Sequence, residues 1–281
     1  MRRRDASLVF FTTLTQWSVG ITIWLAVWQW TDIAPSGTFA TGWDAGNPVL
    51  LALALVGSAT LVSFLHLGKP ANARHATNNL ENSWLSREIL ALGLYSLGLA
   101  AWLTARWLEP GGASGAVLSL AVPTVGLFLL WTMTRVYTVA TIPAWNSGHT
   151  PLSFAATSLC LGLLTLIILG MVQGSGPRGL TLGLLCTILF LEAVSAILNQ
   201  SRLATLSPGI AGSMVTREGY RRVFRFRMAL LLTACGLALF LAVQPGAGSS
   251  AAWLVVLAIL VLGQELAGRV LFYSSYFRLG L

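Results

Sequence analysis

Two titratable side chains flank one short polar stretch of an otherwise apolar sequence. His66 and Glu88 lie in the segment FLHLGKPANARHATNNLENSWLSREIL, residues 64–90, with apolar runs on both sides. Histidine has an ordinary pKa of about 6.5, so its ring can hydrogen-bond a quinone oxygen and change protonation with it. A carboxylate at the start of the next run can carry a proton, although the start of a helix favours a carboxylate there in any case. The pair is the first candidate for a quinone and proton-transfer site.

Other polar side chains fall within or beside apolar runs. Glu192 shares a helix face with Asn199, and Glu265 and Arg269 are spaced i, i+4, which suits an ion pair within one helix. An ionisable group inside a membrane segment is costly, so it indicates either a functional site or a pair that stabilises the bundle. We expect pocket-lining or structural ion pairs here, with Arg135 as a further partner for Glu192.

Arg135 and Tyr137 end the apolar run 115–139. Their position, on the same side of the membrane as His66 and Glu88, makes them further candidates for the quinone site. A polar pocket opening toward that side is therefore predicted.

The sequence predicts no metal ligand set. Cys160, Cys186 and Cys235 each stand alone in an apolar run, without the spacing of a zinc, disulfide or iron–sulfur motif. Any iron–sulfur cluster must therefore belong to a partner. Haem b would need two histidines on facing helices, and none of the three histidines lies at mid-membrane depth, so haem is not expected. The three are His66, His75 and His149.

The composition is that of an integral membrane protein. Of 281 residues, 56% are hydrophobic and 9% charged, whereas about a quarter are charged in soluble domains. The mean hydropathy is +0.76. The net charge of +8 is spread between apolar runs, which favours loops beside an anionic lipid leaflet over a nucleic-acid surface.

Eight runs approach the roughly 20 apolar residues that one membrane crossing needs. They show no period-two alternation, and a bilayer requires backbone groups to be paired internally, so we predict helices. The first run follows MRRRD and is about twice the length of a signal-peptide core, which predicts an uncleaved helix. The expected fold is one all-α bundle of eight transmembrane helices, a single domain over residues 1–281 without a clear repeat. The runs are 8–30, 49–67, 84–108, 115–139, 151–172, 179–200, 226–243 and 251–273.

The basic residues predict the orientation. Fifteen of the 17 Lys and Arg residues fall on the side of the N-terminus, and only Arg106 and Arg178 on the other. The positive-inside rule then places both termini in the cytoplasm. The polar segment 201–225 lies on the same side, either as a docking surface for a soluble partner or as a solvated loop.

Several motifs, taken in order, resemble one known family. They are SFLHLGKPANA at 63–73, LSREI at 85–89, RVYTVATIPAW at 135–145, TPLSF at 150–154 and GQELAGRVLFY at 263–273. Together they resemble the membrane anchor subunit of dimethyl sulfoxide reductase and its relatives. The first helix and the loop before Val49 match poorly.

The resemblance implies a haem-free, non-catalytic anchor of eight helices in the cytoplasmic membrane that binds menaquinol or ubiquinol. Its partners would be a four-cluster iron–sulfur subunit and a molybdopterin catalytic subunit, which serve anaerobic respiration. His66 and Glu88 match the family's quinol site, whereas Arg135, Glu265 and Arg269 match structural or pocket-lining positions. The family also includes cytoplasmic sulfite-oxidising complexes that pass electrons into quinone, and the cytoplasmic position of the pocket and docking segment favours that type.

Two other classes of function remain open. In the first, the helices only tether the soluble subunits and the polar residues pack the bundle. In the second, the protein is a transporter, for which broken helices and repeat symmetry are expected. Neither feature is evident in the sequence.

Overall fold

The computed structural model describes residues 3–31, 47–64, 79–174, 179–206, 217–244 and 251–276, and these ranges contain helices and turns but no strand. The predicted all-helical architecture is confirmed for them. The helices are α1 (Arg3–Trp30), α2 (Pro48–Phe64), α3 (Trp84–Leu108), α4 (Ala113–Tyr137), α5 (His149–Val172), α6 (Gly179–Thr205), α8 (Glu218–Val243) and α9 (Ala251–Ser274).

Seven of these helices are long and apolar enough to cross a membrane. The exception is α2, which is apolar but has 17 residues, fewer than the roughly 20 that a crossing needs. The protein is thus a multi-span membrane protein, and the length of α2 does not by itself establish the predicted eighth crossing.

Two helices extend into the segment that was predicted as one polar loop, 201–225. Helix α6 continues to Thr205, and α8 begins at Glu218 instead of near residue 226. Glu218 accepts a hydrogen bond from Arg222 at 3.1 Å, one turn later, and an acidic residue in the first turn suits the helix dipole. The remaining residues, 207–216, lie outside the described ranges, so the docking prediction is limited to a shorter segment.

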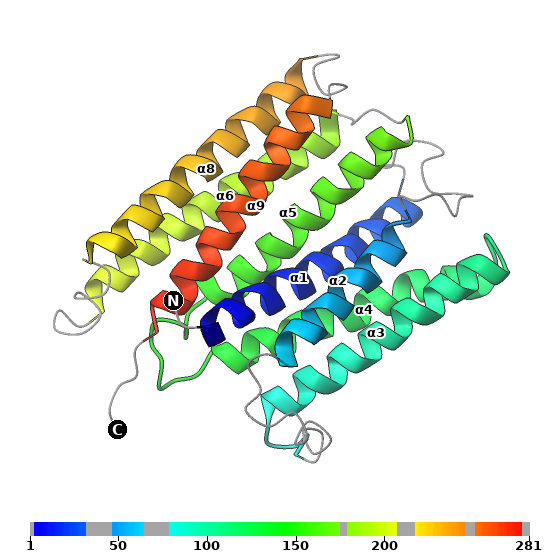
Figure 1. The fold of residues 1–281 in the computed structure, drawn as a ribbon, viewed down its shortest axis with the longest axis horizontal. Coiled ribbons are helices and arrows are strands. Elements are labelled where there is room, and N and C mark those ends of the chain that lie inside the picture. Colours follow the sequence, from blue (N-terminus) through cyan, green and yellow to red (C-terminus); the bar gives the residue numbers. More distant parts are fainter. Residues whose placement is uncertain are drawn as a thin grey trace.

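The helices alternate in direction along the sequence (Figure 1). α1, α3, α5 and α8 begin at the end of the bundle where α2, α4, α6 and α9 finish. We call this the basic end, because among the described residues it holds the arginines of the helix termini and connections, apart from Arg106 at the opposite end.

The contacts between helices divide the bundle into two units of four. In the first, α1 packs on α2, α2 on α3, α3 on α4 and α4 on α1; in the second, α5, α6, α8 and α9 close a ring in the same order. The two units meet along α1 and α5 in the middle of the bundle (Figure 1). The fold is therefore a repeat of one four-helix arrangement, although the sequence shows no clear repeat.

Glycines allow α1 and α5 to touch backbone to backbone. A Cβ atom built on Gly20 would lie 1.7 Å from the Ser158 carbonyl oxygen, and one on Gly162 would lie 2.2 Å from the Gly20 carbonyl carbon. Beside the crossing, Ser158 Oγ donates to the Gln16 carbonyl oxygen at 2.7 Å. Small residues and interhelical hydrogen bonds of this kind stabilise helix pairs in lipid, where the hydrophobic effect between helices is absent.

The pairing of α6 with α8 can be checked by cross-linking. Cys186 Sγ and Cys235 Sγ lie 3.4 Å apart, and both side chains are partly exposed. Treatment of membranes with copper phenanthroline, which supplies the oxidant, should join them in a disulfide with loss of two hydrogens. Mass spectrometry of the intact protein should show this loss in the wild type and in Cys160→Ser, but not in Cys186→Ser. An unreacted wild-type pair would contradict the packing of α6 on α8.

Candidate functional site

Glu88 lies buried at the basic end of α3 without a partner in the described part of the protein. Its side chain is 4% exposed, and it forms no ion pair or hydrogen bond with a described residue. The cap of this helix is Ser83, whose Oγ accepts from the Ser86 amide at 3.2 Å. Glu88 is one turn further on, and because the dipole effect is confined to the first turn, capping does not explain a carboxylate here.

Two tyrosine hydroxyls lie near Glu88. Tyr273 of α9 donates a hydrogen bond to the Tyr137 hydroxyl of α4 at 2.8 Å and lies 3.5 Å from Thr12 Oγ1 of α1. Electrostatic interactions link Glu88 to both phenols. Trp145 and Phe272 pack edge-on against the Tyr137 ring, with centroids at 5.5 Å. Two hydrogen-bonded phenols thus lie among aromatic rings where the two four-helix units join, and the Glu88 carboxylate lies within electrostatic range of both.

The structure separates Arg135 from this cluster. Its side chain is exposed, and its guanidinium carbon lies 4.9 Å from the centroid of the Trp84 ring. Arg135 forms no ion pair with Glu192 or with Glu88. His66, together with the other residues of 65–78, lies outside the described ranges, so the structure brings together only Glu88 and Tyr137 of the four residues predicted for the quinone site.

A second polar cluster lies deep in the second four-helix unit. Arg227 of α8 donates to Glu192 of α6 at 2.5 Å, and both side chains are buried. Gln264 of α9 donates to the other carboxylate oxygen of Glu192 at 3.2 Å. The partner of Glu192 is therefore Arg227 instead of Arg135, because α6 packs on α8 and not on α4. This arrangement suits a structural ion pair, since a lone charge in lipid is costly.

Glu265 and Arg269 are joined through a third residue. Thr157 Oγ1 donates to Glu265 at 2.6 Å and accepts from Arg269 at 2.7 Å. The direct ion pair that the i, i+4 spacing predicted between Glu265 and Arg269 does not form. Arg269 instead reaches across to Gln16 of α1, with a hydrogen bond of 2.5 Å. Its guanidinium carbon also lies 4.2 Å from the Phe154 ring centroid. Arg269 therefore ties the two units together.

The charges around the carboxylates of this cluster favour ion pairs over a metal ion. Ligand atoms of Cys160, Glu192 and Glu265 lie within 4.8 Å of one another. Two guanidinium groups already balance the two carboxylates, and Glu192 uses both of its oxygens on Arg227 and Gln264. A divalent cation would be repelled by the adjacent arginines.

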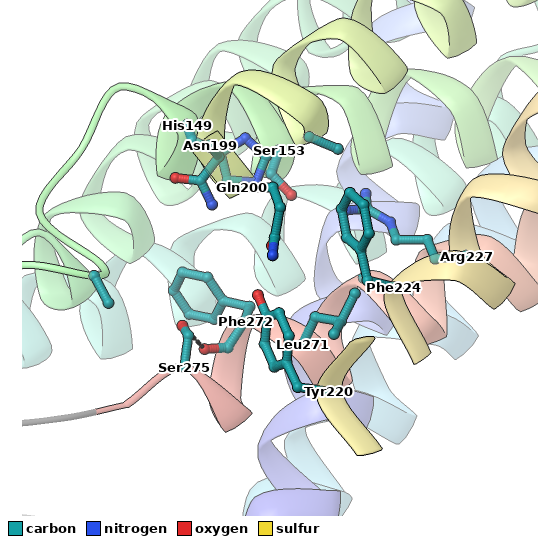
Figure 2. A pocket seen from close by; sticks show the side chains of 13 residues that line it. His149, Ser153, Asn199, Gln200, Tyr220, Phe224, Arg227, Leu271, Phe272 and Ser275 are labelled. Atoms are coloured by element: carbon teal, nitrogen blue, oxygen red, sulfur yellow. Dashed lines mark hydrogen bonds between the residues drawn. The ribbon is translucent and has the colours of Figure 1, made fainter. Parts of the chain in front are cut away.

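A small cavity opens between α5, α6, α8 and α9 at the basic end (Figure 2). Its volume of about 20 Å³ suits a water molecule and not a quinone ring. His149 Nδ1 and Ser195 Oγ are 2.8 Å apart beside it. Neither Glu88 nor Tyr137 lines it, so this cavity is not the pocket predicted beside them. Side chains of α5, α6, α8 and α9 line the cavity, among them His149, Ser153, Asn199, Tyr220, Phe224 and Arg227.

Sequence reasoning missed several residues of these clusters, among them Gln16, Thr157, Arg227 and Tyr273. Tyr273 was noted only as the last residue of the motif GQELAGRVLFY, and Arg227 was counted only as a basic residue for orientation. Gln16 is an amide within an apolar run, and such an isolated polar residue is a usable signal for an interhelical hydrogen bond.

Comparison with known proteins gives a consistent match. A family model described as the DMSO reductase anchor subunit matches residues 1–275. The sequence is 29% identical to the anaerobic dimethyl sulfoxide reductase protein YnfH of Escherichia coli, over 98% of this sequence and 95% of that protein. It is 30% identical to another anaerobic dimethyl sulfoxide reductase protein of the same organism, over 81% and 80% of the two lengths. One protein of the sulfite dehydrogenase of Allochromatium vinosum is 27% identical over 52% of this sequence and 48% of its own length.

Proposed function

We propose that this protein, which belongs to the DMSO reductase anchor subunit family, binds a membrane quinone and exchanges its electrons with an iron–sulfur subunit. Through that subunit it would serve a molybdopterin catalytic subunit. The anchor supplies the quinone site and the membrane attachment of the complex, and the redox centres belong to its partners.

The observation that carries this proposal is the buried carboxylate of Glu88, which has no partner among the described residues and lies within electrostatic range of the hydrogen-bonded Tyr137 and Tyr273 hydroxyls. Quinol oxidation releases two electrons and two protons, so a site needs a proton acceptor and hydrogen bonds to the ring oxygens. Glu88 can accept or return a proton, and the phenols can orient a ring oxygen or pass a proton on. His66 enters the proposal from the sequence alone, as a hydrogen-bond donor to a quinone oxygen. Menaquinone and ubiquinone both fit this chemistry.

We further propose that the basic end faces the cytoplasm in the inner membrane, and that α2 is the eighth crossing. The excess of basic residues at this end supports the orientation. Both termini, the Glu88 cluster and the start of α8 then lie on the cytoplasmic side, where the iron–sulfur subunit would dock. This arrangement fits a cytoplasmic sulfite-oxidising complex that reduces quinone, and the opposite electron flow of a dimethyl sulfoxide reductase uses the same site.

Glu88→Gln should lower quinone-linked turnover of the assembled complex on the order of 100-fold, the usual contribution of a general acid or base. Tyr137→Phe should lower it by a smaller factor, because Tyr273 retains its hydroxyl. Turnover is measured with a soluble quinone analogue and, separately, with a dye that exchanges electrons directly with the soluble subunits. The dye activity should not change. Glu81→Gln is the matched control, since Glu81 is exposed at the same end of α3.

If His66→Ala and Glu88→Gln both leave quinone turnover intact in complexes that retain all of their subunits, the site assignment is wrong. If the wild-type complex is active with the dye but exchanges no electrons with any quinone analogue, the protein is only a tether for the soluble subunits.

A further inference from the structure

One exposed corner of the first four-helix unit gathers positive charge on an aromatic ring. The guanidinium carbons of Arg87 and Arg135 lie 4.2 Å and 4.9 Å from the centroid of the Trp84 ring. Trp131 packs edge-on against the same ring, with centroids 4.9 Å apart. The corner stands at the basic end, where α3 begins and α4 finishes.

Neither arginine of the corner is neutralised by a carboxylate in the described part of the protein, where the ion pairs are Arg222 with Glu218 and Arg227 with Glu192. The segment 65–78, which precedes α3, contains no Asp or Glu in its sequence. Two guanidinium groups held at one ring without a carboxylate partner among the described residues attract an anion. The corner therefore favours an anion.

Hydrogen bonds hold Arg87 in place, whereas the guanidinium N–H groups of Arg135 make none with the described residues. Arg87 Nε and Nη2 donate to the Leu80 and Glu81 carbonyl oxygens, each at 2.7 Å. Arg135 is exposed and forms no hydrogen bond with a described residue, while its guanidinium group contacts the Trp84 ring. Its planar fork of N–H groups suits the two oxygens of a phosphate group.

Exposed apolar side chains lie next to the two arginines and extend from them into the membrane. Trp131 is 50% exposed and Leu85 56% exposed, and Phe128 of α4 stands one turn further into the membrane, next to Trp131. The two arginines lie at the membrane surface, and the exposed rings continue from them into the membrane. This arrangement matches an amphiphile with an anionic head and acyl tails. A free phosphate ion would use only the cations.

We propose that the corner formed by Trp84, Arg87, Trp131 and Arg135 binds an anionic phospholipid, with its phosphate on Arg135 and an acyl tail along Trp131 and Phe128. This proposal is independent of the quinone site, because it uses the exposed face of the same two helices.

Native mass spectrometry of the purified full-length protein tests this site. The protein is incubated with mixed micelles containing equal amounts of phosphatidylglycerol and phosphatidylcholine, and the ratio of the two retained lipids is measured. Arg135→Gln should reduce the preference for phosphatidylglycerol about fivefold, which corresponds to the roughly 1 kcal/mol of one basic residue near an anionic lipid. Arg135→Lys keeps the charge but lacks the planar fork, so its preference should fall between those of wild type and Arg135→Gln. The control is Arg222→Gln, an exposed arginine that already has a carboxylate partner, and it should behave as wild type.

The outcomes separate the possible occupants of the corner. A wild-type preference in a folded Arg135→Gln variant, checked by size-exclusion chromatography, would overturn the proposal. Displacement of phosphatidylglycerol by an excess of inorganic phosphate would identify a free anion site instead.

Discussion

Gly162→Ala is expected to destabilise the protein by roughly 3 kcal/mol or more, at the upper end of the cost of overpacking a core. The added methyl group would meet the backbone of Gly20, at 2.2 Å from its carbonyl carbon and 2.4 Å from its carbonyl oxygen. A backbone cannot rotate away as a side chain can, so α1 and α5 would have to separate. Thermal unfolding in a mild detergent measures the effect, as does the yield of folded protein after membrane extraction.

Gly183→Ala is the matched control for this change. Gly183 also lies within a helix, α6, but a Cβ atom there would meet no atom within 4 Å. This variant should differ from wild type by no more than about 1 kcal/mol, in the stabilising direction, because alanine suits a helix better. Equal stabilities of the two variants would contradict the close crossing of α1 and α5.

Arg227→Met should reduce the free energy of unfolding by roughly 3–5 kcal/mol, the usual cost of leaving one member of a buried ion pair alone. Glu192 would keep only its hydrogen bond from Gln264. The double variant with Glu192→Met should recover much of the loss, because it removes the second charge and its desolvation cost. The same unfolding assay measures both variants.

The exposed pair Glu218 and Arg222 provides the control for the buried pair. The Arg222 side chain is 74% exposed and the Glu218 side chain is 80% exposed. Arg222→Met should therefore change the free energy of unfolding by less than about 1 kcal/mol. The double variant of Glu192 and Arg227 could instead prove as unstable as Arg227→Met. That result would show that the ion pair is not what holds α6 to α8, and that the other contacts of the cluster account for the lost stability.

The helices could be predicted from the sequence because each apolar run is bounded by polar or turn-forming residues. Their ends could not, since a helix continues beyond the lipid wherever its backbone hydrogen bonds allow. The start of α8 is the clearest case: Glu218 and Arg222 belong to the helix but carry no apolar signal.

The candidate site was only partly predictable for a different reason. Spacing within one helix is visible in a sequence, so Glu265 and Arg269 were recognised together, but the neighbour that completes each contact depends on helix packing. Thr157 of α5 and Arg227 of α8 become partners only because α5, α6, α8 and α9 close into one ring. By contrast, the separation of Arg135 from Tyr137 was readable, because residues two apart in a helix lie on opposite sides of it, and in α4 Arg135 is exposed while Tyr137 is buried.

Because each four-helix unit is closed, the second unit could precede the first in the sequence without a change in the fold. Each unit begins and finishes at the basic end, so the link between α4 and α5 does not traverse the bundle, and α1 starts at the end where α9 stops (Figure 1). A circular permutant opened between Tyr137 and His149 would need only a linker at that one end. Every helix would keep its direction and its neighbours, including the glycine contact between α1 and α5.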